Sequence, residues 1–109
     1  MNMLLTTTDD IKGRRVDYIG IVTGEAIMGT NFMKDWFAGI TDVVGGRSGS
    51  YEKSLNKGKD IALAEMAEQA KSIGANAVIA VDLDYEVLGK ENGMMMIVAS
   101  GTAVVVRDE

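Results

Sequence analysis

The chain has 109 residues, which is enough for one domain with a modest core. Hydrophobic residues make up 47% and charged residues 25%, the balance of a folded rather than a disordered protein. The net charge of −5, with no run of Lys and Arg, disfavours nucleic acid as a partner. The sequence has no cysteine or histidine, which excludes disulfides, Ser-His-Asp triads and zinc sites built from sulfur or nitrogen ligands.

Apolar stretches are too short for a membrane, because none approaches the roughly 20 residues that a span needs. The first residues also lack the basic region of a secretory signal. We therefore expect a cytoplasmic protein with no membrane partner.

The N-terminal part predicts an opening hairpin, in which Leu4–Leu5 and the segment Arg15–Val22 form two strands. The following segment, Gly24–Gly29, has glycine spacing similar to that of a phosphate loop. It lacks the Lys and Ser or Thr that such a loop needs, so we interpret it as a turn from strand to helix. Glu25 is the one carboxylate in this turn that could bind a cation.

Two helices are predicted next. Apolar residues recur at helical spacing over residues 30–44, a segment with both phenylalanines and the only tryptophan, Trp36, which we expect in the core or a subunit contact. After a glycine-rich link, a second helix runs from Tyr51 to Ile73 and stops at Gly74. Gly58, inside this helix, suggests that another backbone passes close by.

Two strands, over residues 77–88 and 94–106, end the chain, with Asn92-Gly93 predicting a two-residue hairpin loop between them. That loop would set three pairs opposite each other on one apolar face: Tyr85 with Ser100, Leu83 with Thr102, and Val81 with Val104. On the other face three acidic residues would stand against small ones, namely Asp82, Asp84 and Glu86 against Ala103, Gly101 and Ala99.

The predicted fold class is α+β, a compact ββααββ subunit with a small, mostly antiparallel sheet, spanning residues 1–109 as a single domain. The last strand is apolar on both faces, whereas helices on one side can cover only one of them. We therefore expect identical copies to cover the second face, so that the partner of the chain is the chain itself.

Four segments resemble a known family: Gly24–Phe32, Ile40–Glu52, Gly74–Glu86 and Ser100–Val106. Together they are similar to the uncharacterised bacterial YbjQ-like family, over nearly the whole chain. The resemblance implies a compact α/β subunit assembled as a homopentameric ring. The family carries a heavy-metal-binding label, but this sequence has no Cys or His to serve as soft or borderline ligands. The resemblance transfers no catalytic or binding residue.

One candidate ligand site is the glycine-rich link Gly45, Gly46, Arg47, Ser48 and Gly49. Free amides, an arginine and the start of a helix can together bind a phosphate or carboxylate. The alternative is that the glycines turn the chain, Ser48 or Ser50 caps the helix and Arg47 pairs with a carboxylate.

The alternative candidate site is the row Asp82, Asp84 and Glu86, whose oxygens could hold Mg²⁺, Ca²⁺ or Mn²⁺. A solvated acidic face or a set of salt bridges between subunits explains the same row. The run Met94-Met95-Met96 could suggest Cu(I) ligands, but successive strand residues alternate in direction, which favours core packing.

These observations favour a non-enzymatic, homo-oligomeric binding or assembly module without a cofactor, whose ligand would be a small anion. No residue is assigned a catalytic role. Two alternatives remain: a protein that binds a divalent or heavy metal through carboxylates, and a metal-dependent hydrolase in which Asp82 and Asp84 hold a cation that activates water.

Overall fold

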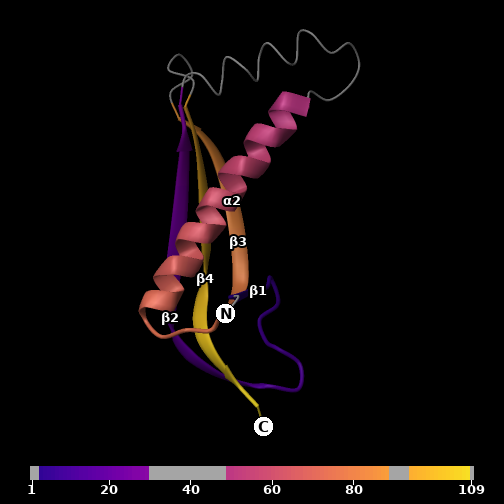
Figure 1. Ribbon diagram of the computed structural model, residues 1–109, viewed down its shortest axis with the longest axis vertical. Coiled ribbons are helices and arrows are strands. Elements are labelled where there is room, and N and C mark those ends of the chain that lie inside the picture. Colours follow the sequence, from indigo (N-terminus) through magenta and orange to yellow (C-terminus); the bar gives the residue numbers. More distant parts are fainter. Residues whose placement is uncertain (1–2, 30–48, 89–93, 109) are drawn as a thin grey trace.

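The computed structural model describes residues 3–29, 49–88 and 94–108 (Figure 1). The elements are the strands β1 (Leu4–Leu5), β2 (Arg15–Met28), β3 (Ala77–Leu88) and β4 (Met94–Arg107), and the helix α2 (Gly49–Ser72). The sheet has the order β1-β3-β4-β2, with β1 parallel to β3 and the other neighbours antiparallel. The α+β class and the mostly antiparallel sheet are therefore confirmed, while the helix predicted over residues 30–44 lies outside the described residues.

The predicted opening hairpin is wrong. Leu4 and Leu5 pair in parallel with Ala77 and Val78 of β3, and β2 pairs along its whole length with β4. The physical reason is the match in length and pattern, since β2 and β4 each have 14 residues and each buries alternate residues at its upper end. A two-residue strand offers too little pairing to compete for β2.

The turn predicted at Gly24–Gly29 is also wrong, because Gly24 to Met28 continue strand β2. A side chain at Gly24 would overlap the carbonyl oxygen of Ala62 and lie 2.5 Å from the backbone nitrogen of Met66, both in α2. Gly24 is therefore needed for close approach of a helix. At Gly58 the obstacle would be the side chain of Ile97, so the backbone crossing predicted there is wrong as well.

The end of α2 follows the sequence prediction. Gly74 has a φ of +90°, the left-handed conformation that glycine adopts without strain. Its N–H donates to the carbonyl of Lys71 at 3.1 Å, and the N–H of Ala75 donates to the carbonyl of Ala70 at 3.0 Å. These two bonds form a Schellman motif, which satisfies the last helical carbonyls.

The β3–β4 hairpin exists, but its predicted register is wrong. Tyr85 lies opposite Ile97 and Leu83 opposite Ala99, with Leu88 and Met94 as the last described pair, a register that the expected two-residue loop at Asn92-Gly93 cannot give. Near the start of β3, Ala80 has a φ of 54° and forms a bulge, which adds a residue to one strand and reverses the alternation. Val78 and Val81 consequently both pack on the core side.

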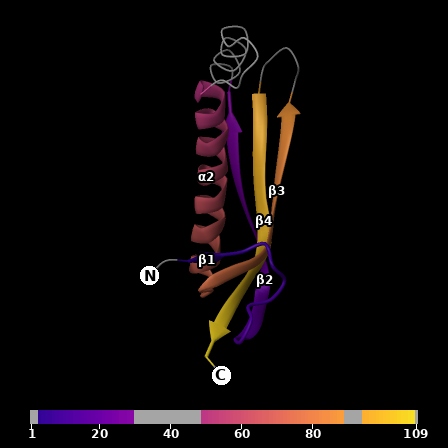
Figure 2. The ribbon, with the colours of Figure 1, turned by 90° about the vertical axis from the view of Figure 1, so that its right-hand side faces the viewer.

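Helix α2 covers one face of the sheet and packs chiefly on β2 and β4. Figure 2 shows β3 as the long strand farthest from the helix. The core between the layers consists mainly of small residues with a few larger ones, and its fully buried large side chains are those of Met66, Ile97, Val22 and Val78. Val104 is also fully buried, but on the opposite face of the sheet. The opposite face of the sheet has no helix on it within the described residues.

Candidate functional site

The sheet face turned away from α2 carries a strip of apolar side chains. We define this open strip as Tyr18, Ile21 and Ile27 of β2 with Met96 and Val98 of β4. Ile21 is 83% exposed, Tyr18 73% and Ile27 57%, whereas Met96 and Val98 are half-buried. Among the described residues β4 carries apolar side chains on both faces, and no described helix lies on this one.

One end of this face is covered by the segment between β1 and β2. Ala77, Ile79 and Val104 are buried there, with Ile11 packed against them. The N–H of Ala80 donates to the carbonyl of Thr8 at 2.7 Å, which fastens the segment to β3 at the bulge. Tyr18 lies opposite the covered Val104, at the margin of this cover, and the other members of the open strip lie beyond it.

Asp82, Asp84 and Glu86 form an acidic row on the open face, beside the open strip. They share one side of β3 as predicted, but their neighbours on β4 are Ser100, Val98 and Met96, so the predicted opposition to Ala103, Gly101 and Ala99 is wrong. The register explains the difference, because an odd shift of three residues exchanges the two faces of β4.

The acidic row shows mutual repulsion. A hydrogen bond with the side chain of Asp82 raises the pKa of Asp84 above its ordinary value, and the charges of Asp82 and Glu86 raise it further. Within residues 3–29, 49–88 and 94–108, no three His, Cys, Asp or Glu side chains come together in a way that could hold a metal ion.

The other sequence candidates are placed only in part. Of the glycine-rich link, Gly45 to Ser48 lie outside the described residues and Gly49 is the first residue of α2, while Trp36 also lies outside. Met95 is buried against Met28 and Leu55. Met94 and Met96 are half-buried on the opposite side of β4, as the alternation predicted.

A cluster of charges at the lower end of the sheet was missed by the sequence analysis. Asp17 accepts hydrogen bonds from Arg107 at 2.8 Å and from Arg15 at 3.1 Å. The bond from Arg107 is the main cause that lowers the pKa of Asp17. Arg15 and Arg107 are direct partners in the β2–β4 ladder, so only knowledge of that pairing would have revealed the cluster.

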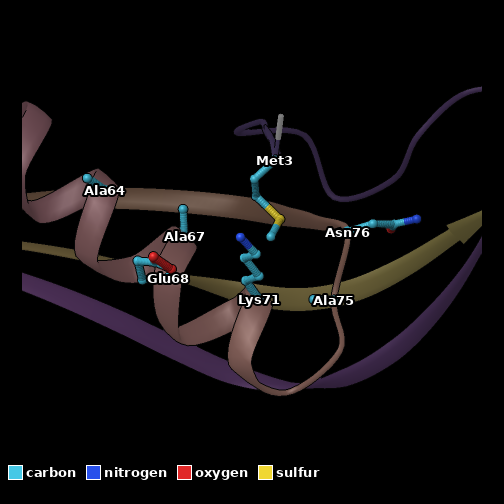
Figure 3. A pocket seen from close by; sticks show the side chains of 7 residues that line it. All are labelled: Met3, Ala64, Ala67, Glu68, Lys71, Ala75 and Asn76. Carbon is cyan, nitrogen blue, oxygen red and sulfur yellow. The ribbon is translucent and has the colours of Figure 1, made fainter. Parts of the chain in front are cut away.

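A hollow of 360 Å³ lies between α2 and the N-terminal segment (Figure 3). Three of its seven lining residues are alanines, and the side chains of Met3 and Lys71 point toward one another across it, with Glu68 nearby. The side chain of Asn76 is turned away to Val106 of β4. The hollow brings together neither two carboxylates nor a nucleophile with a base, so its lining suggests no reaction.

Taken together, the fold and its surfaces define a one-helix α+β subunit with an open apolar sheet face. The chain belongs to the YbjQ family, whose model, described as "Putative heavy-metal-binding", matches residues 3–107. Its fold is similar to that of a solved DUF74-family protein of unknown function from Pediococcus pentosaceus ATCC 25745, with a TM-score of 0.73 and 13% identity over 96% of this chain and 98% of that one. At this identity the likeness concerns the fold alone.

The residues of this chain do not fit a heavy-metal centre. Such ions prefer thiolate and imidazole ligands, and the whole sequence has no cysteine or histidine. Among the described residues, no three carboxylates lie close enough together to hold a metal ion either. The same part of the chain has no helix that is long and apolar enough to cross a membrane.

Proposed function

We propose that this protein is a non-enzymatic assembly module that joins copies of itself through the open strip. The observation that carries the proposal is the exposure of Ile21, 83%, in the middle of a long strand, with Tyr18 and Ile27 exposed on the same strand. Thr23 and Glu25 lie between Ile21 and Ile27 on the same face, so the exposed apolar side chains form two groups rather than one patch. Large apolar side chains with this much exposure on a sheet face are typical of an interaction site. Their burial would contribute about 25 cal/mol for each Å² removed from water.

A second copy is the favoured occupant because the subunit carries complementary charges at separate places. The arginines at the lower end of β2 and β4 lie far along the sheet from the acidic row on β3. A head-to-tail arrangement could place the arginines of one copy against the acidic row of the next. Such contacts close into a ring when the rotation between copies is suitable. The family resemblance implies five copies, and we propose a pentamer in the bacterial cytoplasm.

The test is the mass of the native protein in solution. Light scattering after size-exclusion chromatography at micromolar concentration should give a multiple of the 11.7 kDa chain mass, five being the expected number. Ile21→Glu should reduce this mass to that of one chain, because a buried unpaired carboxylate opposes association. The matched control is Ile61→Glu on α2, where the isoleucine is also exposed, at 43%. A wild-type mass of one chain would contradict the proposal.

The small-anion site at Gly45, Gly46, Arg47, Ser48 and Gly49 belongs to the same proposal. It is supported by the start of α2 at Gly49, since the positive end of a helix dipole favours a bound anion beside it. Inorganic phosphate should raise the melting temperature of the wild type more than that of Arg47→Ala. An equal shift in both proteins would remove the site.

A further inference from the structure

Among the described residues, nothing pairs with the outer edge of β3 over most of its length. β1 pairs with only Ala77 and Val78, and the last backbone bond on this side joins the N–H of Val81 to the carbonyl of Thr6 at 3.0 Å. In a strand, alternate residues direct their backbone groups to the same side. The N–H and carbonyl groups of Leu83, Tyr85 and Val87 therefore point away from β4, and they have no backbone partner among the described residues.

An apolar groove lies beside this edge, between β3 and α2. Its volume is 470 Å³, and it is lined by Leu5, Thr6, Thr7, Lys59, Leu63, Val81 and Leu83. The groove-side surface of β3 continues along Tyr85 and Val87, which are 48% and 50% exposed. It is left open because α2 lies mainly over β2 and β4, as Figure 2 shows.

The acidic row stands on the opposite face of the same edge, at positions that alternate with Leu83, Tyr85 and Val87. An extended chain added to this edge would therefore direct every second side chain into the groove and the others toward carboxylates. The apolar groove favours hydrophobic side chains in the first set. The acidic row favours Lys or Arg in the second.

We propose that the β3 edge from Leu83 to Val87 binds an extended segment of a partner protein in which apolar and basic residues alternate. Backbone hydrogen bonds supply the part of the affinity that does not depend on the sequence of the segment. The groove and the acidic row supply the selectivity for apolar and basic side chains, as in other cases of strand addition. The assembly proposed above also uses the acidic row, so the peptide and the arginines of a second copy would compete for it.

The strands of a second copy fit this edge less well. Its β3 would bring a second acidic row, and its β2 carries Glu25 on the open face. The β2 edge is also partly occupied, because the N–H of Thr23 donates to Oε1 of Gln69 at 2.7 Å. A basic segment of another protein meets neither obstacle.

The test uses the full chain and a fluorescent seven-residue peptide of alternating Val and Lys, with binding followed by anisotropy. Asp82→Asn/Asp84→Asn/Glu86→Gln should weaken binding about tenfold, since three exposed ion pairs are lost. The matched control, Glu65→Gln/Glu68→Gln on α2, should keep the affinity. A peptide of alternating Val and Glu, and one N-methylated at the residues that face β3, should not bind.

Hydrogen exchange shows where the peptide lies. The amides of Leu83, Tyr85 and Val87 should exchange rapidly in the protein alone and slowly with the peptide bound. Two results would overturn the proposal. A peptide of the same composition with its Val and Lys residues grouped could bind equally well, which would indicate charge attraction alone. Protection of the three amides without peptide would show that another copy already covers the edge.

Discussion

Gly24 of β2 lies directly against the carbonyl oxygen of Ala62 in α2, so the helix approaches the sheet more closely than any side chain at position 24 would allow. Gly24→Ala would press a methyl group against the backbone of two helical residues, which cannot rotate away as a flexible side chain can. We expect a loss of about 2 kcal/mol or more in the free energy of unfolding, measured by urea denaturation.

Gly20→Ala is the matched control for this prediction. It lies in the same strand, and no heavy atom lies within 4 Å of the position that its Cβ would take. Its free energy of unfolding should stay within about 0.5 kcal/mol of the wild type. Equal stability of the two variants would show that the helix does not pack on β2 at Gly24.

The elements with strong local patterns could be predicted from the sequence. The apolar spacing of α2 and its stop at Gly74 define that helix, and alternation defines the two C-terminal strands. The partner of β2 could not be predicted, because the nearby segment Leu4–Leu5 gives a hairpin signal while the true partner lies about 80 residues away. The role of Gly24 could not be predicted either, because it depends on the packing of α2 against β2. In the sequence alone, a glycine that allows a helix to pack closely cannot be distinguished from a glycine that forms a turn.

The candidate site was predictable to the same extent. Alternation alone places Asp82, Asp84 and Glu86 on one side of β3. The face of the sheet that they occupy depends on the bulge at Ala80, and their neighbours depend on the register between β3 and β4. Neither has a clear sequence signal. The free edge and the groove depend on where α2 lies across the sheet, which is a property of the packed core.

The raised pKa of Asp84 leads to a prediction about pH. The folded state binds this proton more readily than the unfolded chain, so Asp84 favours folding at low pH, and this contribution is lost as pH rises through the raised pKa. At neutral pH repulsion within the acidic row remains. Asp84→Asn should therefore raise the melting temperature at pH 7 slightly, and the difference should vanish below about pH 4.

Asp17→Asn should show the opposite dependence. Hydrogen bonds from Arg107 and Arg15 lower the pKa of Asp17, so its contribution to stability is present at neutral pH and is lost as pH falls through the lowered pKa. Asp17→Asn should lower the melting temperature at pH 7 and have less effect in acid. If both variants moved the melting temperature in the same direction at pH 7, the charge arrangement described here would be incorrect.

The side chain of Asn76, just before β3, forms two hydrogen bonds with the backbone near the end of β4. Its side-chain NH₂ donates to the carbonyl of Val106 at 3.1 Å, and its oxygen accepts the N–H of Val106 at 2.7 Å. Asn76→Ala removes both bonds and leaves two partly buried backbone groups without a partner, so we expect a loss of about 1–2 kcal/mol in calorimetry. Asn76→Asp keeps only the acceptor oxygen, so its stability should lie between that of the wild type and that of Asn76→Ala. A wild-type value for Asn76→Ala would indicate that water replaces the amide.

The absence of cysteine and histidine in a family described as heavy-metal-binding predicts how this chain responds to metals. A ligand at 100 times its dissociation constant stabilises a protein by about 2.7 kcal/mol, which in a domain of this size raises the melting temperature by on the order of 10 °C. We expect no such rise with Zn²⁺, Cd²⁺ or Cu⁺. Mg²⁺, Ca²⁺ and Mn²⁺ test the carboxylate alternative, because a rise that is lost in Asp84→Asn would assign a cation to the acidic row. A rise with Zn²⁺ or Cd²⁺ that survives in this variant would contradict our prediction and show that other ligands hold the ion.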